Sequence, residues 1–247
     1  MELINKSHPQ DKLYRVNETD SYTRERIINH KVNEAMKILP EHWRDRNFSM
    51  VTNETLKIVC DKLKQWDFKT PIISSLISKQ NGIGKSFIGT CLIRKYFYDR
   101  IAPDFDEYFV EWNEHEAGMY YGDGKVFLRN TYYHEVSILD DKKLHMEIQE
   151  TFAKKKTDSQ KNILDKYVGY KFLVIDDMFS NRSNEFARQN ILYVIDERTE
   201  YLNRPTFITS NLTIDEIADI DTRIADRINN SMLFQIDKPI ESYRSKK

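Results

Sequence analysis

The residues best suited to chemistry lie in a glycine-containing stretch, Asn-Gly-Ile-Gly-Lys-Ser-Phe, at positions 81–87. Small residues let backbone N–H groups wrap a phosphate, a lysine can reach its outer oxygens, and a hydroxyl can hold Mg²⁺. The helix expected to follow would add an N-terminal dipole and unpaired N–H groups, which favour anions. We therefore predict that ATP binds here. The residues expected to bind the nucleotide are Asn81, Gly82, Ile83, Gly84, Lys85, Ser86 and Phe87.

One position departs from the phosphate-loop pattern G-x-x-x-x-G-K-[ST]. The first glycine of that pattern falls on Lys79. That glycine serves the geometry of the turn and makes no chemical contact, so its replacement weakens the match without removing it. The sequence leaves open whether Lys79 slows ATP turnover.

A second motif is an apolar run, residues 172–175, that ends in Asp176 and Asp177. Uniformly apolar runs of this kind are typical of buried strands in parallel sheets. We expect Asp176 to hold Mg²⁺ through water, together with Ser86, and Asp177 to orient or activate the attacking water. The alternative is an ordinary polar strand end. The occurrence of both motifs in this order, each at the end of a strand, favours a nucleotide site.

Two further sets of polar side chains could complete this site. Asn211 follows a short strand at residues 207–209, where its amide could lie beside Asp177 and contact phosphate or water. Arg223 and Arg227 are four positions apart and therefore share one helix face. An arginine that acts across a subunit interface would stabilise charge on the γ-phosphate. The alternatives are a helix-capping turn at Asn211 and solvent-exposed arginines.

These motifs require strands that end at one edge of a sheet, with helices between them. The hydrophobic patterns predict strands at residues 71–77, 125–130, 172–176, 207–209 and 232–236. They predict helices at residues 22–38, 53–66, 85–99, 185–202, 213 onward and 221–230, and two or three helices within 131–169. Asn53 is expected to cap one helix, and Thr213 and Glu216 to form a capping box. Alternating strands and helices predict a parallel sheet covered by helices.

The acidic segment 101–124 has six carboxylates between Asp104 and Glu116 and no lysine or arginine up to residue 124. We interpret this segment as a solvated surface insertion, with a docking surface as the alternative. Its role is not evident from the sequence.

Composition narrows the class of protein. The 247 residues are 40% hydrophobic and 31% charged, and the formal net charge of −1 gives no support for nonspecific coating of nucleic acid. Cys60 and Cys91 are expected to be buried thiols in a reducing compartment. The sequence shows no signal peptide and no apolar run long enough to span a membrane. We therefore expect a cytoplasmic protein with no membrane partner.

Taken together, the motifs resemble the AAA+ ATPases of the DnaC/IstB group. The resemblance spans roughly residues 38–244. It rests on the phosphate loop and on the segments Leu173–Asp177, Ile195–Arg198, Pro205–Leu212, Asp221–Ile228, Phe234–Asp237 and Glu241–Arg244. It implies a P-loop AAA+ core, that is, an α/β fold with a five-stranded parallel sheet flanked by helices and no C-terminal lid domain.

The resemblance also implies roles for single residues. Asp176 would be the Walker B magnesium acid, Asp177 the catalytic acid and Asn211 the sensor 1 residue. Arg227 would be the arginine finger, and Arg223 a second arginine that faces phosphate or the subunit interface. ATP and Mg²⁺ would bind between neighbouring subunits, which implies self-association.

Partners within this group differ. DnaC-type proteins load the DnaB-type replicative helicase onto single-stranded DNA, whereas IstB-type proteins assist a transposase. Residues 41–247 would form the ATPase domain, and residues 1–40 a short arm and helix that could bind a partner. We favour an ATP-dependent helicase loader in DNA replication initiation, for which a phage or mobile-element protein with a shortened arm would fit.

Three alternatives stay open. They are an IstB-like ATPase, an ATP-binding adaptor or inhibitor that docks on a helicase, and a small-molecule kinase, against which Asn211 and the paired arginines argue. The identity of the partner, the size of the oligomer and a host or phage origin are not evident from the sequence.

Binding of single-stranded DNA would need cations and aromatic rings along a channel. A solvated helix surface is the alternative for each of the candidates. These are Arg129, Tyr132, Tyr133, Lys154, Lys155 and Lys156.

Overall fold

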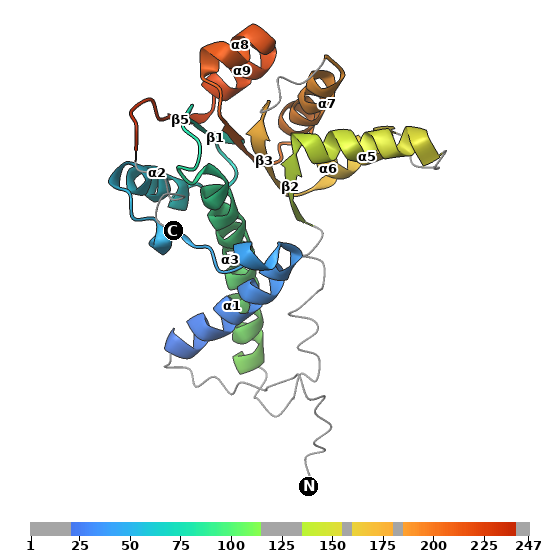
Figure 1. The fold of residues 1–247 in the computed structure, drawn as a ribbon. Helices are drawn as coiled ribbons and strands as arrows, with labels where there is room; N and C mark the ends of the chain where they lie inside the picture. Colours follow the sequence, from blue (N-terminus) through green and yellow to red (C-terminus); the bar gives the residue numbers. More distant parts are fainter. Residues whose placement is uncertain (1–20, 115–134, 155–159, 180–184, 241–247) are drawn as a thin grey trace. The chain divides into compact units, whose positions relative to one another are not determined.

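The computed structural model describes residues 21–114, 135–154, 160–179 and 185–240 (Figure 1). The chain forms two compact units, one from residues 1–44 and 97–133 and the other from residues 45–96 and 134–247. Helix α3 (Lys85–Glu114) contributes residues to both units. Within the described ranges, no helix is both long enough and apolar enough to cross a membrane.

The first unit is helical. Its elements are α1 (Ser21–Ala35), the 3-10 turns η1 (Met36–Ile38) and η2 (Glu41–Trp43), and the second part of α3. This confirms the helix predicted at residues 22–38, whose last turn tightens to a 3-10 turn. Ile28 and Phe97 are fully buried here. The Tyr98 hydroxyl of α3 donates a hydrogen bond to the Glu25 carboxylate of α1 at 2.5 Å, which holds the two helices together.

Helix α3 is longer than predicted. The expected end was near Asp99, but the helix continues through Pro103 to Glu114. A proline removes one backbone hydrogen bond from a helix, and the turns on either side can maintain the helix across that gap. The first part of the acidic segment is therefore helical, and residues 115–124 lie outside the described ranges.

A five-stranded parallel sheet forms the centre of the second unit (Figure 1). Its order is β2-β3-β4-β1-β5, and every neighbouring pair is parallel. The strands are β1 (Ile73–Ile77), β2 (Val136–Asp140), β3 (Phe172–Met178), β4 (Thr206–Ser210) and β5 (Met232–Gln235). The predicted α/β class with five parallel strands is confirmed. Because all strands run the same way, their carboxyl ends meet at one edge, where ligands of such sheets bind.

One strand was assigned wrongly from the sequence. The Val-Ser-Ile-Leu-Asp segment at residues 136–140 forms strand β2, although helices were predicted throughout residues 131–169. Periodicity does not separate a strand from a helix in so short an apolar run. Pairing with β3 decides the outcome, since Val136 aligns with Phe172 and Asp140 with Asp176. The strand predicted at residues 125–130 lies outside the described ranges.

Helices and short turns surround the sheet. In addition to the first part of α3, they are η3 (Phe48–Met50), α2 (Glu54–Lys64), α5 (Asp141–Lys154), α6 (Gln160–Gly169), α7 (Glu185–Asp196), the π-helical turn η5 (Glu197–Tyr201), α8 (Ile214–Ile220) and α9 (Thr222–Asn229). Both predicted caps are confirmed. The Asn53 side chain accepts from the Leu56 N–H at 3.2 Å, and Thr213 and Glu216 form a reciprocal capping box.

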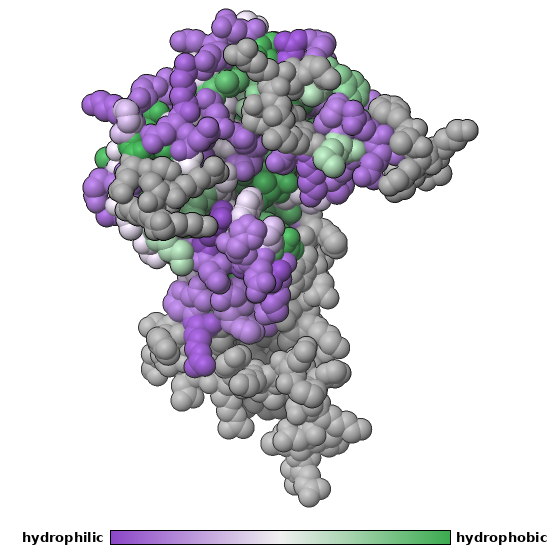
Figure 2. All heavy atoms as spheres, viewed as in Figure 1, coloured by the Kyte–Doolittle hydropathy of each residue, from purple (hydrophilic) through white to green (hydrophobic). Residues whose placement is uncertain are grey.

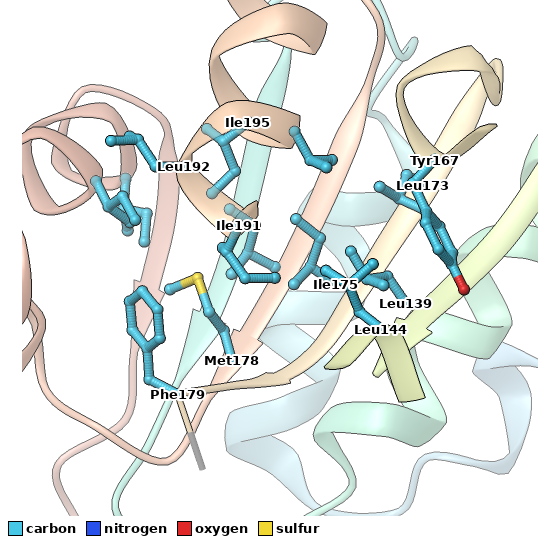
Figure 3. Close-up of a cluster of buried hydrophobic side chains, with 14 of the residues drawn as sticks. Leu139, Leu144, Tyr167, Leu173, Ile175, Met178, Phe179, Ile191, Leu192 and Ile195 are labelled. Carbon is cyan, nitrogen blue, oxygen red and sulfur yellow. The ribbon is translucent and has the colours of Figure 1, made fainter. Parts of the chain in front are cut away.

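Alternate residues of β3 face opposite layers of the second unit, as the two-residue period of a strand requires. Leu173 and Ile175 belong to a buried cluster that includes residues of α5, α6 and α7 (Figure 3). Phe172 faces the other layer, where its ring lies 6.1 Å from the Trp66 ring and 5.4 Å from the Tyr96 ring, centroid to centroid. The sheet is therefore buried on both faces.

Arg198, in the π-helical turn, is a fully buried cation that donates hydrogen bonds to neutral oxygens. Its guanidinium donates to the carbonyls of Tyr167, Val168, Tyr170 and Pro205 and to a threonine hydroxyl at position 206. Burial lowers the pKa of Arg198 to about 9. The arginine thus joins the end of α6 to the start of β4, which gives a structural reason for the Ile195–Arg198 motif.

Gly89 lets α3 approach the sheet closely. A Cβ atom at this position would lie 3.0 Å from Val174 Cγ1 on β3 and 3.5 Å from Phe207 Cδ1 on β4. A larger side chain would push the helix away from the two strands that end near the phosphate loop.

We predict that Gly89→Leu lowers the free energy of unfolding by about 1–3 kcal/mol, because overpacking forces backbone shifts. Urea denaturation followed by circular dichroism would measure this change. Gly169→Ala is the control, since a Cβ there meets only Arg204 Nη1 at 4.0 Å, and it should change stability by less than about 0.5 kcal/mol. Equal stability of Gly89→Leu and the parent chain would show that the helix does not depend on this contact.

Candidate nucleotide-binding site

The strand register brings the predicted residues to one edge of the sheet. Ile77, the last residue of β1, is paired with Ser210 of β4, and Met178 of β3 is paired with the same serine. The phosphate loop follows β1, the two acids end β3 and Asn211 follows β4. Three segments that are far apart in the sequence therefore lie next to one another at the carboxyl edge of the sheet.

The phosphate loop closes around the Lys85 ammonium. Gly82 and Gly84 have φ angles of 75° and 107°, values that L side chains rarely adopt. Lys85 Nζ donates to the backbone carbonyls of Ser78 and Gln80, at 2.9 Å each, and the side chain is 7% exposed. The loop thus holds a positive charge at its centre, directly at the start of α3.

The remaining loop residues have distinct environments. Ile83 is fully buried and anchors the loop, whereas Asn81 is exposed. Ser86 and Phe87 lie in the first turn of α3 and are partly buried. A helix N-terminus, a central lysine and a first-turn hydroxyl match what a nucleotide triphosphate with Mg²⁺ would need, so these residues fit that ligand.

Lys79, which replaces the first glycine of the pattern, points to α8. Its ammonium forms an ion pair with Glu216, with Nζ 3.0 Å from Oε1. The backbone N–H of Thr213 lowers the pKa of the Glu216 carboxyl, and the bond from Lys79 lowers it further. The next residue, Gln80, hydrogen-bonds both the N–H and the carbonyl of Ile240. The loop is thus joined to α8 and to the last described segment.

A β-bulge places the two acids. Ile175 is paired with Ile208 and Met178 with Ser210, so Asp176 and Asp177 together lie opposite the single residue Thr209. The φ angle of Asp177 is 55°, in the left-handed region. The Thr209 hydroxyl accepts from the Asp177 N–H at 2.8 Å and donates to Asp176 Oδ1 at 2.7 Å.

Asn211 contacts the second acid, as the sequence indicated. Its side-chain amide donates to Asp177 Oδ1. Its carbonyl oxygen, Oδ1, is buried and has no hydrogen-bond partner among the described residues. A buried acceptor of this kind calls for a donor such as water. Asp177 and Asn211 therefore form a polar pair that could hold a water molecule between them.

Sequence reasoning missed two residues at this edge. Thr209 was noted only as part of the segment before Asn211. Arg46 was not singled out. Its guanidinium lies over the Phe87 ring, with Cζ 5.3 Å from the centroid. Burial lowers the pKa of Arg46, while the negative charge of Asp176 opposes this shift. No local pattern marks Arg46, because its position depends on tertiary contacts.

The two predicted arginines contact a different group of side chains. On α9, Arg227 forms ion pairs with Asp196 Oδ1, at 2.8 Å, and with Glu200. Arg223 is more exposed and pairs with Asp221 at 2.9 Å. In Figure 2, the described residues over α8 and α9 are mostly hydrophilic. Both arginines therefore have carboxylate partners within their own chain.

The candidates for single-stranded DNA contact cannot be placed. The side chains concerned lie outside those that the structure describes, although Lys154 ends helix α5. They are Arg129, Tyr132, Tyr133, Lys154, Lys155 and Lys156.

Similar solved structures identify the fold. The DnaC helicase loader matches with a TM-score of 0.54 and 14% identity over 80% of this chain and 100% of that chain. The fold is that of an AAA+ protein. DnaI matches this chain with a TM-score of 0.53 and 14% identity, covering 83% of it and 98% of DnaI.

A third match is to a protein of replication initiation. AMPPCP-bound DnaA from Aquifex aeolicus has a TM-score of 0.53 and 11% identity over 81% of this chain. The chain spans about half of that DnaA, 52% of its length. No protein-family model and no curated protein sequence matches the chain.

We predict that Lys85→Ala abolishes ATP binding, because it removes the one buried cation at the centre of the loop. Titration with a fluorescent ATP analogue would measure the affinity. The exposed Lys79 serves as a control, and Lys79→Ala should bind within about threefold of the parent chain, since exposed ion pairs contribute little. A thermal melt would confirm that both variants are folded. Retained binding by folded Lys85→Ala would contradict the assignment of the loop.

Proposed function

We propose that this protein is an ATPase that loads a DnaB-type replicative helicase onto single-stranded DNA. The observation that carries the ATPase is the meeting of a lysine-centred phosphate loop, two acids in a bulge and an amide with an unpaired oxygen. These are the parts that phosphoryl transfer to water requires, namely phosphate binding, a metal acid and a residue that positions water. We further propose that the protein acts in the cytoplasm.

In the proposed site, the loop residues bind the phosphates. Lys85 supplies positive charge to the outer phosphates, and the N–H groups at the start of α3 point at them. Ser86 and Asp176 would hold Mg²⁺, which when bound neutralises charge on the phosphate oxygens. Asp177 accepts a hydrogen bond from the attacking water, and Asn211 holds the Asp177 carboxylate in place while its own oxygen binds the same water.

Arg227 would act across an interface between subunits. In the single chain, its charge is balanced by Asp196 and Glu200, with the side chain 22% exposed. Arrival of a neighbouring subunit's γ-phosphate would offer the guanidinium a stronger partner, because arginine binds phosphate oxygens through two parallel bonds. Arg223, on the same helix, would be a second arginine at this interface. Self-association is therefore part of the proposal.

Support for the loader function comes from likeness in fold. The DnaC helicase loader matches over its full length, and DnaI over nearly all of its length. A DnaA structure holds both AMPPCP and single-stranded DNA. An IstB-like role beside a transposase, or an adaptor that binds ATP without hydrolysing it, would use the same fold, so experiments must separate these functions.

We predict that Arg227→Ala binds ATP normally but loses hydrolysis by at least about 100-fold, given what an arginine supplied across an interface contributes. Phosphate release would measure the rate. Mixing Arg227→Ala with Lys85→Ala should restore hydrolysis. In the mixture, an Arg227→Ala subunit binds ATP, and a neighbouring Lys85→Ala subunit supplies Arg227. No recovery in the mixture would argue against an arginine acting between subunits.

A control separates this role from a structural one. Asp196→Asn weakens the ion pair within the chain but keeps Arg227, so it should hydrolyse ATP within about threefold of the parent protein. If Asp196→Asn loses as much activity as Arg227→Ala, the ion pair itself is what matters.

For the loader function, we predict that the protein and ATP place the purified replicative helicase of the same organism on circular single-stranded DNA. Gel filtration would show the helicase eluting with the DNA. Asp177→Asn should bind the helicase and remain attached to it, because release depends on hydrolysis. If the parent protein and Asp177→Asn load and release the helicase equally well, the protein is an adaptor that does not depend on hydrolysis. Failure to bind the helicase, with binding to a transposase, would favour the IstB-like function.

A further inference from the structure

Strand β3 ends in a β-bulge, in which one backbone N–H needs a hydrogen-bond acceptor from outside the strand ladder. Between Ile175 and Met178, two residues of β3 face one residue of β4. The extra residue in a bulge loses its regular ladder hydrogen bond. A buried N–H without a partner is costly, so the bulge is stable only if another acceptor is supplied. Here that acceptor is the side chain of Thr209, which is fully buried.

The same hydroxyl also fixes the first acid. Thr209 Oγ1 accepts one hydrogen bond, from the Asp177 N–H, and donates its own proton to Asp176 Oδ1. The donated bond orients the Asp176 carboxylate and leaves its second oxygen, Oδ2, as the one that can turn to a metal-bound water. The accepted bond holds Asp177 at its φ of 55°, a value uncommon for a residue with a side chain.

Flanking residues hold the chain on the far side of the acids. Met178 and Phe179 are fully buried in the cluster with α7, and Figure 3 shows both on the side of Ile191. Phe179 also has a positive φ, of 62°. The turn is thus anchored after Asp177 by packing and before it by the sheet, and Thr209 supplies the bond between these two anchors.

We propose that Thr209 is a positioning residue for ATP hydrolysis, setting the orientation of both acids through one hydroxyl. This inference rests on the proposed ATPase function. It assigns to Thr209 a role separate from that of Asn211, whose amide donates a hydrogen bond to the Asp177 side chain. Because both hydrogen bonds of the hydroxyl are made to the two acids, its loss should impair the chemical step and not the binding of ATP.

The test compares Thr209→Val, which keeps the shape and removes the hydroxyl, with Thr209→Ser, which keeps the hydroxyl. For Thr209→Val we expect kcat to fall about 10- to 100-fold, because small misplacements of catalytic groups slow a reaction by this much. The KM should stay within about threefold of the parent chain. Thr209→Ser should recover kcat to within about threefold of the parent chain. The Mg²⁺ concentration for half-maximal activity should rise in Thr209→Val, because Asp176 is no longer held.

Ser74→Ala is a matched control for the loss of a buried sheet hydroxyl. Ser74 Oγ bonds the Met232 carbonyl at 3.3 Å, away from the acids, so this variant should keep its kcat. Equal kcat in Thr209→Val and the parent chain would overturn the proposal. So would a loss of kcat that Thr209→Ser does not recover. The parent chain and Asp177→Asn are measured first, and no difference between them would overturn the ATPase function itself.

Discussion

The close contact between α3 and the sheet is the constraint on which the site depends. A side chain at Gly89 would meet Val174 of β3 and Phe207 of β4, which are the strands that lead to the acids and to Asn211. The helix that carries the phosphate loop therefore packs directly against the strands that carry the polar groups. Because protein interiors are closely packed, this contact fixes the spacing between the loop and the acids more firmly than the loops could.

The polar groups at the edge of the sheet are held in place by other groups of the second unit. Lys85 is held by the carbonyls of its own loop, and the acids are held by Thr209 of β4 and by Asn211, which follows β4. All of these bonds join groups of the chain itself. Groups that are already oriented cost little reorganisation when a ligand arrives, which is the condition under which electrostatic stabilisation works best. The Arg227 group differs, because its charge is already balanced within the chain.

Much of this arrangement could be predicted from the sequence. The phosphate loop, the acids and the Asn211 contact follow from residue type and strand order, because parallel strands must end at one edge. Strand β2 and the length of α3 could not be predicted, since β2 depends on its pairing with β3 and a proline ordinarily ends a helix. The two hydrogen bonds of Thr209 could not be predicted either. They depend on the β-bulge in β3, and the sequence does not show where a strand gains one extra residue.

The order of the strands also bears on how the protein is made. Strand β1 lies between β4 and β5, and Ser74 bonds a residue 158 positions further along the chain. During synthesis, β1 and the phosphate loop emerge early, yet the first neighbour of β1, strand β4, begins only at Thr206, and the second, β5, at Met232. Contacts so distant in sequence form slowly. The sheet therefore cannot close around β1 until β4 and β5 have been translated, so the edge at which the candidate site lies forms late in folding.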